Sequence, residues 1–160
     1  MIANKCLTKE WVARKKQEMG SVDPALLEKS IHALALLCGL GESPIPFVFK
    51  GGTSIILLLR EFRRLSIDID IVTDMPRVKY EPVLDDIGGK APFLGFEQDD
   101  RGERGLPHRM HFKFFYNSAI CRQTILEYSA GMIHTLPGAI FSHCFGPLPG
   151  PGYNACAVQA

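Results

Sequence analysis

The segment of 25 residues between Phe47 and Ile71 holds side chains that could bind a nucleoside triphosphate (NTP) and a divalent metal ion. A glycine pair comes first, two hydroxyl residues follow it, and two carboxylates spaced two residues apart come later. These residues are Gly51, Gly52, Thr53, Ser54, Asp68 and Asp70.

The two carboxylates fit a magnesium site. On an extended strand, Asp68 and Asp70 project from the same face, about 6.5 Å apart along the chain. Sites that transfer phosphoryl groups with two metals hold the ions about 3.5–4 Å apart, which this spacing allows. Mg²⁺ prefers oxygen ligands and keeps several of its waters, so two or three carboxylates suffice. We therefore expect Mg²⁺, or Mn²⁺, as the cofactor, with Asp68 and Asp70 as its ligands.

The glycine pair fits the phosphates of the same substrate. Without Cβ atoms, the backbone N–H groups of Gly51 and Gly52 can approach phosphate oxygens closely, and a helix that starts there adds a favourable dipole for anions. Thr53 and Ser54 offer hydroxyl donors. Local positive charge comes from Lys50 and from the arginines that include Arg64, although the net charge of the chain is only +1.

Four helices are expected from apolar periodicity and capping residues. The first spans Thr8–Met19. The second starts at Pro24, capped by Asp23, and ends at the glycines from residue 39 onward. The third follows a tight bend at the glycine pair, is capped by Thr53 or Ser54, and spans 53–62. A short fourth helix is expected near 82–87.

The strands are expected from β-branched and aromatic runs. They cover 47–49, 66–72, 93–96, 110–116 and 124–128. In the second run, Ile67, Ile69 and Ile71 alternate with polar residues, which predicts a strand with one apolar and one acidic face. The fold class is therefore α/β (α+β), with a small mixed sheet flanked by helices.

Composition indicates a globular domain in a reducing compartment. Of 160 residues, 46% are hydrophobic and 22% charged, which is ordinary for such a domain. The longest apolar run is too short to span a membrane. The five cysteines form no Cys-x-x-Cys pair, so we expect free thiols and a cytoplasmic location. Residues 129–160 contain no Asp, Glu, Lys or Arg, so we divide the chain into a domain of residues 1–128 and an uncharged tail, 129–160.

The order of these motifs resembles the AbiEii/AbiGii toxin family of nucleotidyltransferases, within the DNA polymerase β-like superfamily. The resemblance is carried by Lys50-Gly-Gly-Thr-Ser-Ile55 and by Arg64-Leu-Ser-Ile-Asp-Ile-Asp-Ile71. It implies a polymerase β-like core in which Asp68 and Asp70 bind metal and act in catalysis. The nucleotide would contact residues of both segments, namely Lys50, Gly51, Gly52, Thr53, Ser54, Arg64 and Ser66.

The resemblance also implies a third acidic residue on a later strand. Glu127 is the best match, as a metal ligand or as the base for the attacking hydroxyl, and Lys113 on the neighbouring strand is expected on the same side. The implied reaction is Mg-dependent transfer of a nucleoside monophosphate from an NTP to a hydroxyl of RNA, such as tRNA, or of a protein. The implied setting is a toxin–antitoxin or phage-defence system with an antitoxin as partner.

Two other functions stay open at this point. A phosphohydrolase with Asp68 as its nucleophile would need a longer buried strand before that residue. A catalytically weak or inactive remnant would bind nucleotide or a partner protein without turnover, as the uncharged tail suggests. A P-loop is excluded because Lys50 precedes the glycines, and His108 and His111 would lie on opposite faces of a strand, which disfavours a shared metal.

Overall fold

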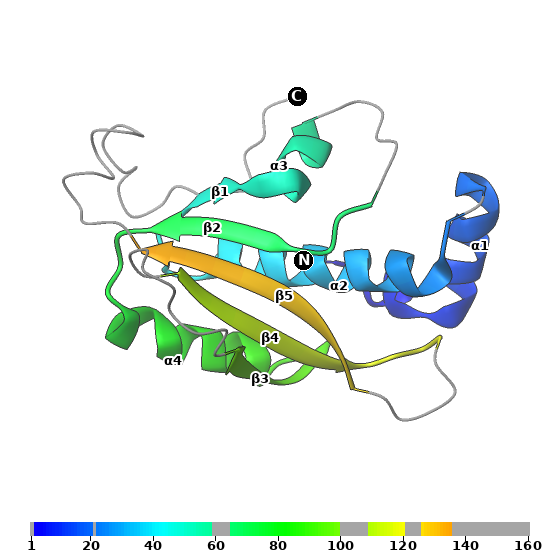
Figure 1. The fold of residues 1–160 in the computed structure, drawn as a ribbon. Coiled ribbons are helices and arrows are strands. Elements are labelled where there is room, and N and C mark those ends of the chain that lie inside the picture. The colour runs from blue at the N-terminus through cyan, green and yellow to red at the C-terminus, as the bar shows by residue number, and fades with distance from the viewer. Residues whose placement is uncertain (1, 21, 59–64, 100–108, 121–125, 136–160) are drawn as a thin grey trace.

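A computed structural model describes residues 2–20, 22–58, 65–99, 109–120 and 126–135 of the chain (Figure 1). Arg64, His108, residues 59–62 of the third expected helix and residues 136–160 of the expected tail lie outside this described part. Within it, no helix is long and apolar enough to cross a membrane. Cys6 and Cys38 are free thiols, as expected.

The described strands form one mixed sheet. In chain order they are β1 (Val48–Lys50), β2 (Ile69–Thr73), β3 (Phe93–Asp99), β4 (Arg109–Asn117) and β5 (Leu126–Thr135). Their spatial order is β1-β2-β5-β4-β3. β2 and β5 run parallel, whereas the other neighbours are antiparallel. The expected small mixed sheet flanked by helices is confirmed.

Four α-helices and one short 3₁₀-helix accompany the sheet in the described residues. They are η1 (Asn4–Leu7), α1 (Lys9–Met19), α2 (Pro24–Glu42), α3 (Gly51–Leu58) and α4 (Arg77–Gly88). Figure 1 shows α2 and α4 on the same side of the sheet, with α3 beside β1 at the sheet edge. Two expected starts are confirmed. The Thr8 side chain caps α1, and the Asp23 carboxylate accepts from the Ala25 N–H at 2.9 Å at the start of α2.

The core lies between the sheet and the pair α2 and α4. Alternate residues of β4 enter it, and Phe112, Phe114 and Tyr116 are almost fully buried. They pack against Leu36 of α2 and Leu84 of α4, among others. The inner face of the sheet is thus apolar, and functional side chains must come from the opposite face or the edge.

The second helix is longer than expected. α2 continues through Gly39 and Gly41 to Glu42, where the backbone N–H and hydroxyl of Ser43 both bond to the Leu40 carbonyl. Glycine inside a helix costs only about 1 kcal/mol relative to alanine, which tertiary packing can offset. At Gly39 a Cβ would lie 3.1 Å from Ile87 of α4, so this glycine lets the two helices approach closely.

The third helix begins earlier than expected. Gly51 and Gly52 are its first residues rather than a bend before it, and Thr53 is not its cap. β2 in turn begins at Ile69 instead of 66, so Ser66 and Asp68 precede the strand. The expected acidic face of this strand is also wrong in part, because Val72, on the same face as Asp70, is buried.

The remaining elements differ from expectation in their ends. β1 is shifted by one residue, α4 starts at Arg77, and β3 and β4 run further than expected. β5 continues to Thr135, so residues 129–135, the first part of the expected uncharged tail, belong to the sheet. Pairing with β2 and β4 on both sides explains this extension, because it satisfies the backbone groups of a strand whose composition is a weak signal.

Candidate active site

The antiparallel pairing of β1 and β2 places Lys50 directly opposite Asp70. Lys50 ends β1, and the chain passes at once into α3 through Gly51, whose φ is +80°. A Cβ at residue 51 would lie 3.0 Å from Cγ of Asp70 and would overlap its Oδ2 atom. The structure therefore brings the first residue of α3 against a half-buried carboxylate. Three of the predicted site residues meet here.

Thr53 fixes the segment that leads to this carboxylate. Its buried Oγ1 lies 2.6 Å from the Asp68 carbonyl oxygen and 2.8 Å from Oγ of Ser66. Because a carbonyl oxygen only accepts, Thr53 donates its proton to Asp68, and the Ser66 hydroxyl donates to Thr53. These two hydroxyls thus join α3 to the approach to β2, and their predicted contact with nucleotide stays a prediction.

Ser54 is held within its own helix. Its Oγ donates to the Gly51 carbonyl at 2.7 Å. The hydroxyl oxygen keeps a lone pair, but its proton is not directed at a phosphate in this conformation. The backbone N–H groups of Gly52 and its neighbours in the first turn remain the natural donors for an anion at the N-terminus of α3.

Asp68 and Asp70 differ in their surroundings. Asp68 is exposed just before β2, whereas Asp70 is half-buried within the strand. The two carboxylates are two residues apart in the chain, and their position on one face of a strand stays a prediction because Asp68 precedes β2. No group of three or more Asp, Glu, His or Cys side chains in the described residues could hold a metal ion. A pair of carboxylates still fits Mg²⁺, which is commonly bound by one or two carboxylates together with substrate phosphates and waters.

The strand register does not bring Glu127 to this pair. Residue 127 lies opposite Tyr116, whose side chain is in the core. Asp70 instead lies beside residue 132, and residues of odd and even number on β5 occupy opposite faces. The register therefore pairs residue 127 with a neighbour other than the one that lies beside Asp70. Its predicted catalytic role remains untested.

Lys113 occupies a position on the face of Asp70 rather than on that of residue 127. It pairs with residue 130 of β5, which shares its face with residue 132 and hence with Asp70. Its Nζ lies 4.0 Å from Oε1 of Glu97 on β3. The register thus places Lys113 on the face of the sheet that carries Asp70.

Sequence reasoning missed two features of this face. The contact of Gly51 with Asp70 depends on the β1–β2 register, which no local pattern gives. The other is a basic outer face on β4, where His111 and Lys113 alternate with buried apolar residues. The signal for it lies in the sequence between residues 110 and 116, where His111 and Lys113 alternate with aromatic and apolar residues.

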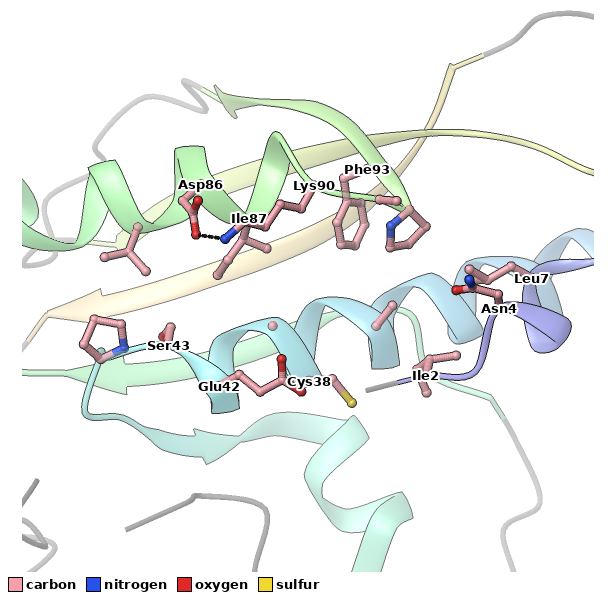
Figure 2. A pocket seen from close by; sticks show the side chains of 16 residues that line it. Ile2, Asn4, Leu7, Cys38, Glu42, Ser43, Asp86, Ile87, Lys90 and Phe93 are labelled. Atoms are coloured by element: carbon pink, nitrogen blue, oxygen red, sulfur yellow. Dashed lines mark hydrogen bonds and ion pairs between the residues drawn. The ribbon is translucent and has the colours of Figure 1, made fainter. Parts of the chain in front are cut away.

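A cavity of about 340 Å³ lies away from these residues, on the helix side of the sheet (Figure 2). Its walls include Ala35 and Cys38 of α2, Ile87 of α4, and Phe93 at the start of β3. None of the predicted site residues lines it. The candidate active site thus lies outside this cavity, at the junction of β1, α3 and β2.

Comparison with known proteins gives one match. Residues 35–130 match a family model described as nucleotidyl transferase AbiEii toxin, type IV toxin–antitoxin system. The matched region includes α3, β2 and the site described above. Searches of curated proteins and of solved structures gave no match.

Proposed function

The chain belongs to the AbiEii nucleotidyl transferase toxin family, and on that premise we propose that it transfers a nucleoside monophosphate from an NTP to an acceptor hydroxyl. The main structural support for this proposal is that the Asp70 carboxylate lies against Gly51 at the N-terminus of α3. A metal-binding group and anion-binding backbone amides then meet at one point, as an NTP bound with its metal requires.

In the proposed reaction, the acceptor oxygen attacks the α-phosphorus of the NTP. The bond from that phosphorus to the α–β bridging oxygen breaks, pyrophosphate leaves, and the acceptor proton passes to water. Mg²⁺ or Mn²⁺, when bound, would reduce the negative charge around the α-phosphate.

Each residue of the site has a distinct proposed part in this reaction. Asp70 and Asp68 hold the metal, the first turn of α3 holds the β- and γ-phosphates, and Lys50 adds positive charge beside them. Thr53 acts through Asp68 by fixing the backbone of that residue. The acceptor is an RNA, such as tRNA, or a protein, and the cellular effect is growth inhibition that a cognate antitoxin counteracts.

Labelled NTPs test this proposal. The protein is incubated with each NTP, Mg²⁺ or Mn²⁺, and total RNA or total protein, and transfer of label is measured. Asp70→Asn and Asp68→Asn should each reduce transfer by at least about 100-fold, as loss of a metal-binding carboxylate does at such sites. Asp85→Asn, an exposed carboxylate on α4, is the matched control and should leave transfer unchanged.

Absence of label transfer by folded wild-type protein, with any NTP and either metal, would refute the proposed activity. Equal transfer by Asp70→Asn would refute the assigned role of Asp70. Cell growth provides a second measurement: expression of the wild type should inhibit it, and expression of Asp70→Asn should not.

A second candidate is nucleotide binding without turnover. It is favoured by the strand register, in which residue 127 pairs with Tyr116 and not with a neighbour of Asp70. Calorimetry that detects Mg-NTP binding by a chain with no transfer activity would support this candidate over the first.

A further inference from the structure

The outer face of β4 carries a basic and aromatic row, in an order that suits a nucleic-acid strand. Positions 111, 113 and 115 hold His, Lys and Phe, and they alternate with core residues. The alternate residues Met110, Phe112, Phe114 and Tyr116 are each at most 9% exposed. Because strand residues alternate between faces, the basic and aromatic row points away from α2 and α4.

This row shares its face with the candidate active site. His111 pairs with residue 132 of β5, and residue 132 pairs with Asp70 of β2. Partners in register lie on the same face, and each step between strands is about 4.8 Å. His111 therefore lies about 10 Å across the sheet from Asp70, and Lys113 and Phe115 continue the row along β4. Figure 1 shows the broad surface of β5 and β4 with no described helix in front of it.

The residue types in this row match the two chemical parts of a single strand. Ammonium and imidazole N–H groups bind phosphates, and an aromatic ring provides a stacking surface for a base. Open sheet faces with aromatic and basic residues are a common way to bind single-stranded RNA. A protein acceptor would gain little from such a row unless it were itself strongly acidic.

We propose that the outer face of β4 binds the acceptor, and that this acceptor is a single-stranded polynucleotide. Lys113 and His111 contact its phosphates, Phe115 stacks on a base, and the strand leads its reactive hydroxyl toward Asp70. This inference rests on the proposed nucleotidyl transfer at Asp70, and it assigns specificity to residues outside the metal and triphosphate site.

Lys113 could have a purely structural role, as the ion-pair partner of Glu97, instead of binding phosphate. Its Nζ is 4.0 Å from the Glu97 carboxylate, and residue 99 pairs with His111 in the same hairpin. The side chains of Lys113 and Glu97 are 25% and 55% exposed. Ion pairs with this much solvent contact contribute little to stability, so a phosphate can replace Glu97 as the partner of Lys113. Removal of the Glu97 charge therefore distinguishes a structural role of Lys113 from phosphate binding, because only the second predicts stronger binding of an oligonucleotide.

Binding of a labelled single-stranded oligoribonucleotide, measured by fluorescence anisotropy without NTP, tests the inference. Lys113→Gln should weaken binding several-fold and reduce the dependence on salt by about one counterion. Phe115→Ala should weaken binding on the order of tenfold, whereas Phe115→Tyr should retain it. Glu97→Gln should strengthen binding, and Lys79→Gln on α4 is the matched control that leaves it unchanged.

The outcomes also distinguish this inference from the proposed function. Mg-NTP binding by calorimetry should be the same for wild type and Lys113→Gln. If wild type binds Mg-NTP but not the oligonucleotide at low salt, the inference is wrong and the proposed function stands. If Glu97→Gln and Lys113→Gln leave oligonucleotide binding unchanged, β4 is not the acceptor surface. If wild type neither binds Mg-NTP nor transfers label, the proposed function itself is wrong.

Discussion

The carboxylate of Asp70 occupies the space that a Cβ atom would fill at Gly51. The two residues are far apart in the chain and meet because β1 and β2 pair with Lys50 opposite Asp70. Gly51 also has a φ of +80°, which an L side chain rarely adopts. Glycine is thus needed here for two independent reasons, the backbone conformation and the close approach of the carboxylate.

Gly51→Ala should lower both stability and nucleotide binding. The positive φ alone should cost about 1–2 kcal/mol of unfolding free energy, and the new methyl group should displace Asp70 from α3. Denaturant unfolding and Mg-NTP calorimetry measure the two effects. Gly20→Ala is the control, because Gly20 has the same φ of +80° with nothing within 4 Å of a Cβ. It should lose stability but keep full Mg-NTP affinity, and equal loss of affinity in both variants would contradict a specific contact with Asp70.

Thr53→Val should cost about 1–3 kcal/mol of unfolding free energy, because it leaves a carbonyl and a hydroxyl without their buried partner. It should also reduce the rate of transfer, since the backbone of Asp68 loses its tie to α3. Thr53→Ser retains the hydroxyl and should recover most of the rate. Ser66→Ala removes only the second bond and should be milder in both measurements. A Thr53→Val protein with unchanged transfer would show that the tie does not position Asp68.

The sequence alone predicts elements whose signals are local. α1 and the start of α2 follow from Thr8, Asp23 and Pro24, which act within a few residues of themselves. β4 follows from the aromatic run of residues 110–116. The end of α2 does not follow, because the packing of Gly39 against Ile87 is a contact between helices and outweighs the poor helix propensity of glycine.

In the candidate site, too, the sequence predicts residue types but not the contacts between distant residues. Gly51 and Asp70 could be identified from their residue types and order, but their contact depends on strand register. Glu127 is predicted from its position on a later strand, whereas the face of a strand residue depends on the register, in which residue 127 pairs with Tyr116. A sequence contains no direct record of such pairings, so a third carboxylate is the least predictable part of a site of this kind.

Glu28→Ala should destabilise the fold by roughly 1.5–3 kcal/mol, the usual cost of losing hydrogen bonds to a buried charge. Glu28 is 3% exposed, and its two oxygens accept from Oγ of Ser118 and from the backbone N–H of Ala119, each at 2.6 Å. It thereby holds the end of β4 against α2. Denaturant unfolding measures the loss.

Glu28→Gln should cost clearly less than Glu28→Ala. The amide oxygen can still accept from the Ala119 N–H, and the amide NH₂ can donate to the hydroxyl of Ser118. Glu10→Ala, an exposed residue of α1, is the control and should change stability by at most about 0.5 kcal/mol. Equal stability of Glu28→Ala and wild type would show that this carboxylate does not hold β4 to α2.

His32 should make the protein less stable in mild acid. It is buried in α2, where its ring stacks on Tyr116 with centroids 3.5 Å apart. Its Nδ1 is 3.0 Å from the Glu28 carbonyl oxygen, so Nδ1 carries the proton of the neutral ring. Burial lowers the pKa of His32 below its ordinary value, and the hydrogen bond to Glu28 opposes this only in part.

Because the pKa of His32 is lower in the folded protein, protonation of this residue destabilises the fold. The unfolded chain binds a proton at His32 more readily than the folded protein does, so protonation favours unfolding. The contribution of His32 is complete above its unfolded pKa of 6.5 and is lost as the pH falls below that value. Denaturant unfolding at about pH 7.5 and about pH 5.5 should therefore show a lower unfolding free energy in acid. His32→Phe keeps a stacked ring but cannot be protonated. It should lose about 1 kcal/mol relative to the wild type at about pH 7.5 and less than that at about pH 5.5, so its drop between the two pH values should be smaller. An equal drop in His32→Phe and in the wild type would assign the acid sensitivity to other groups.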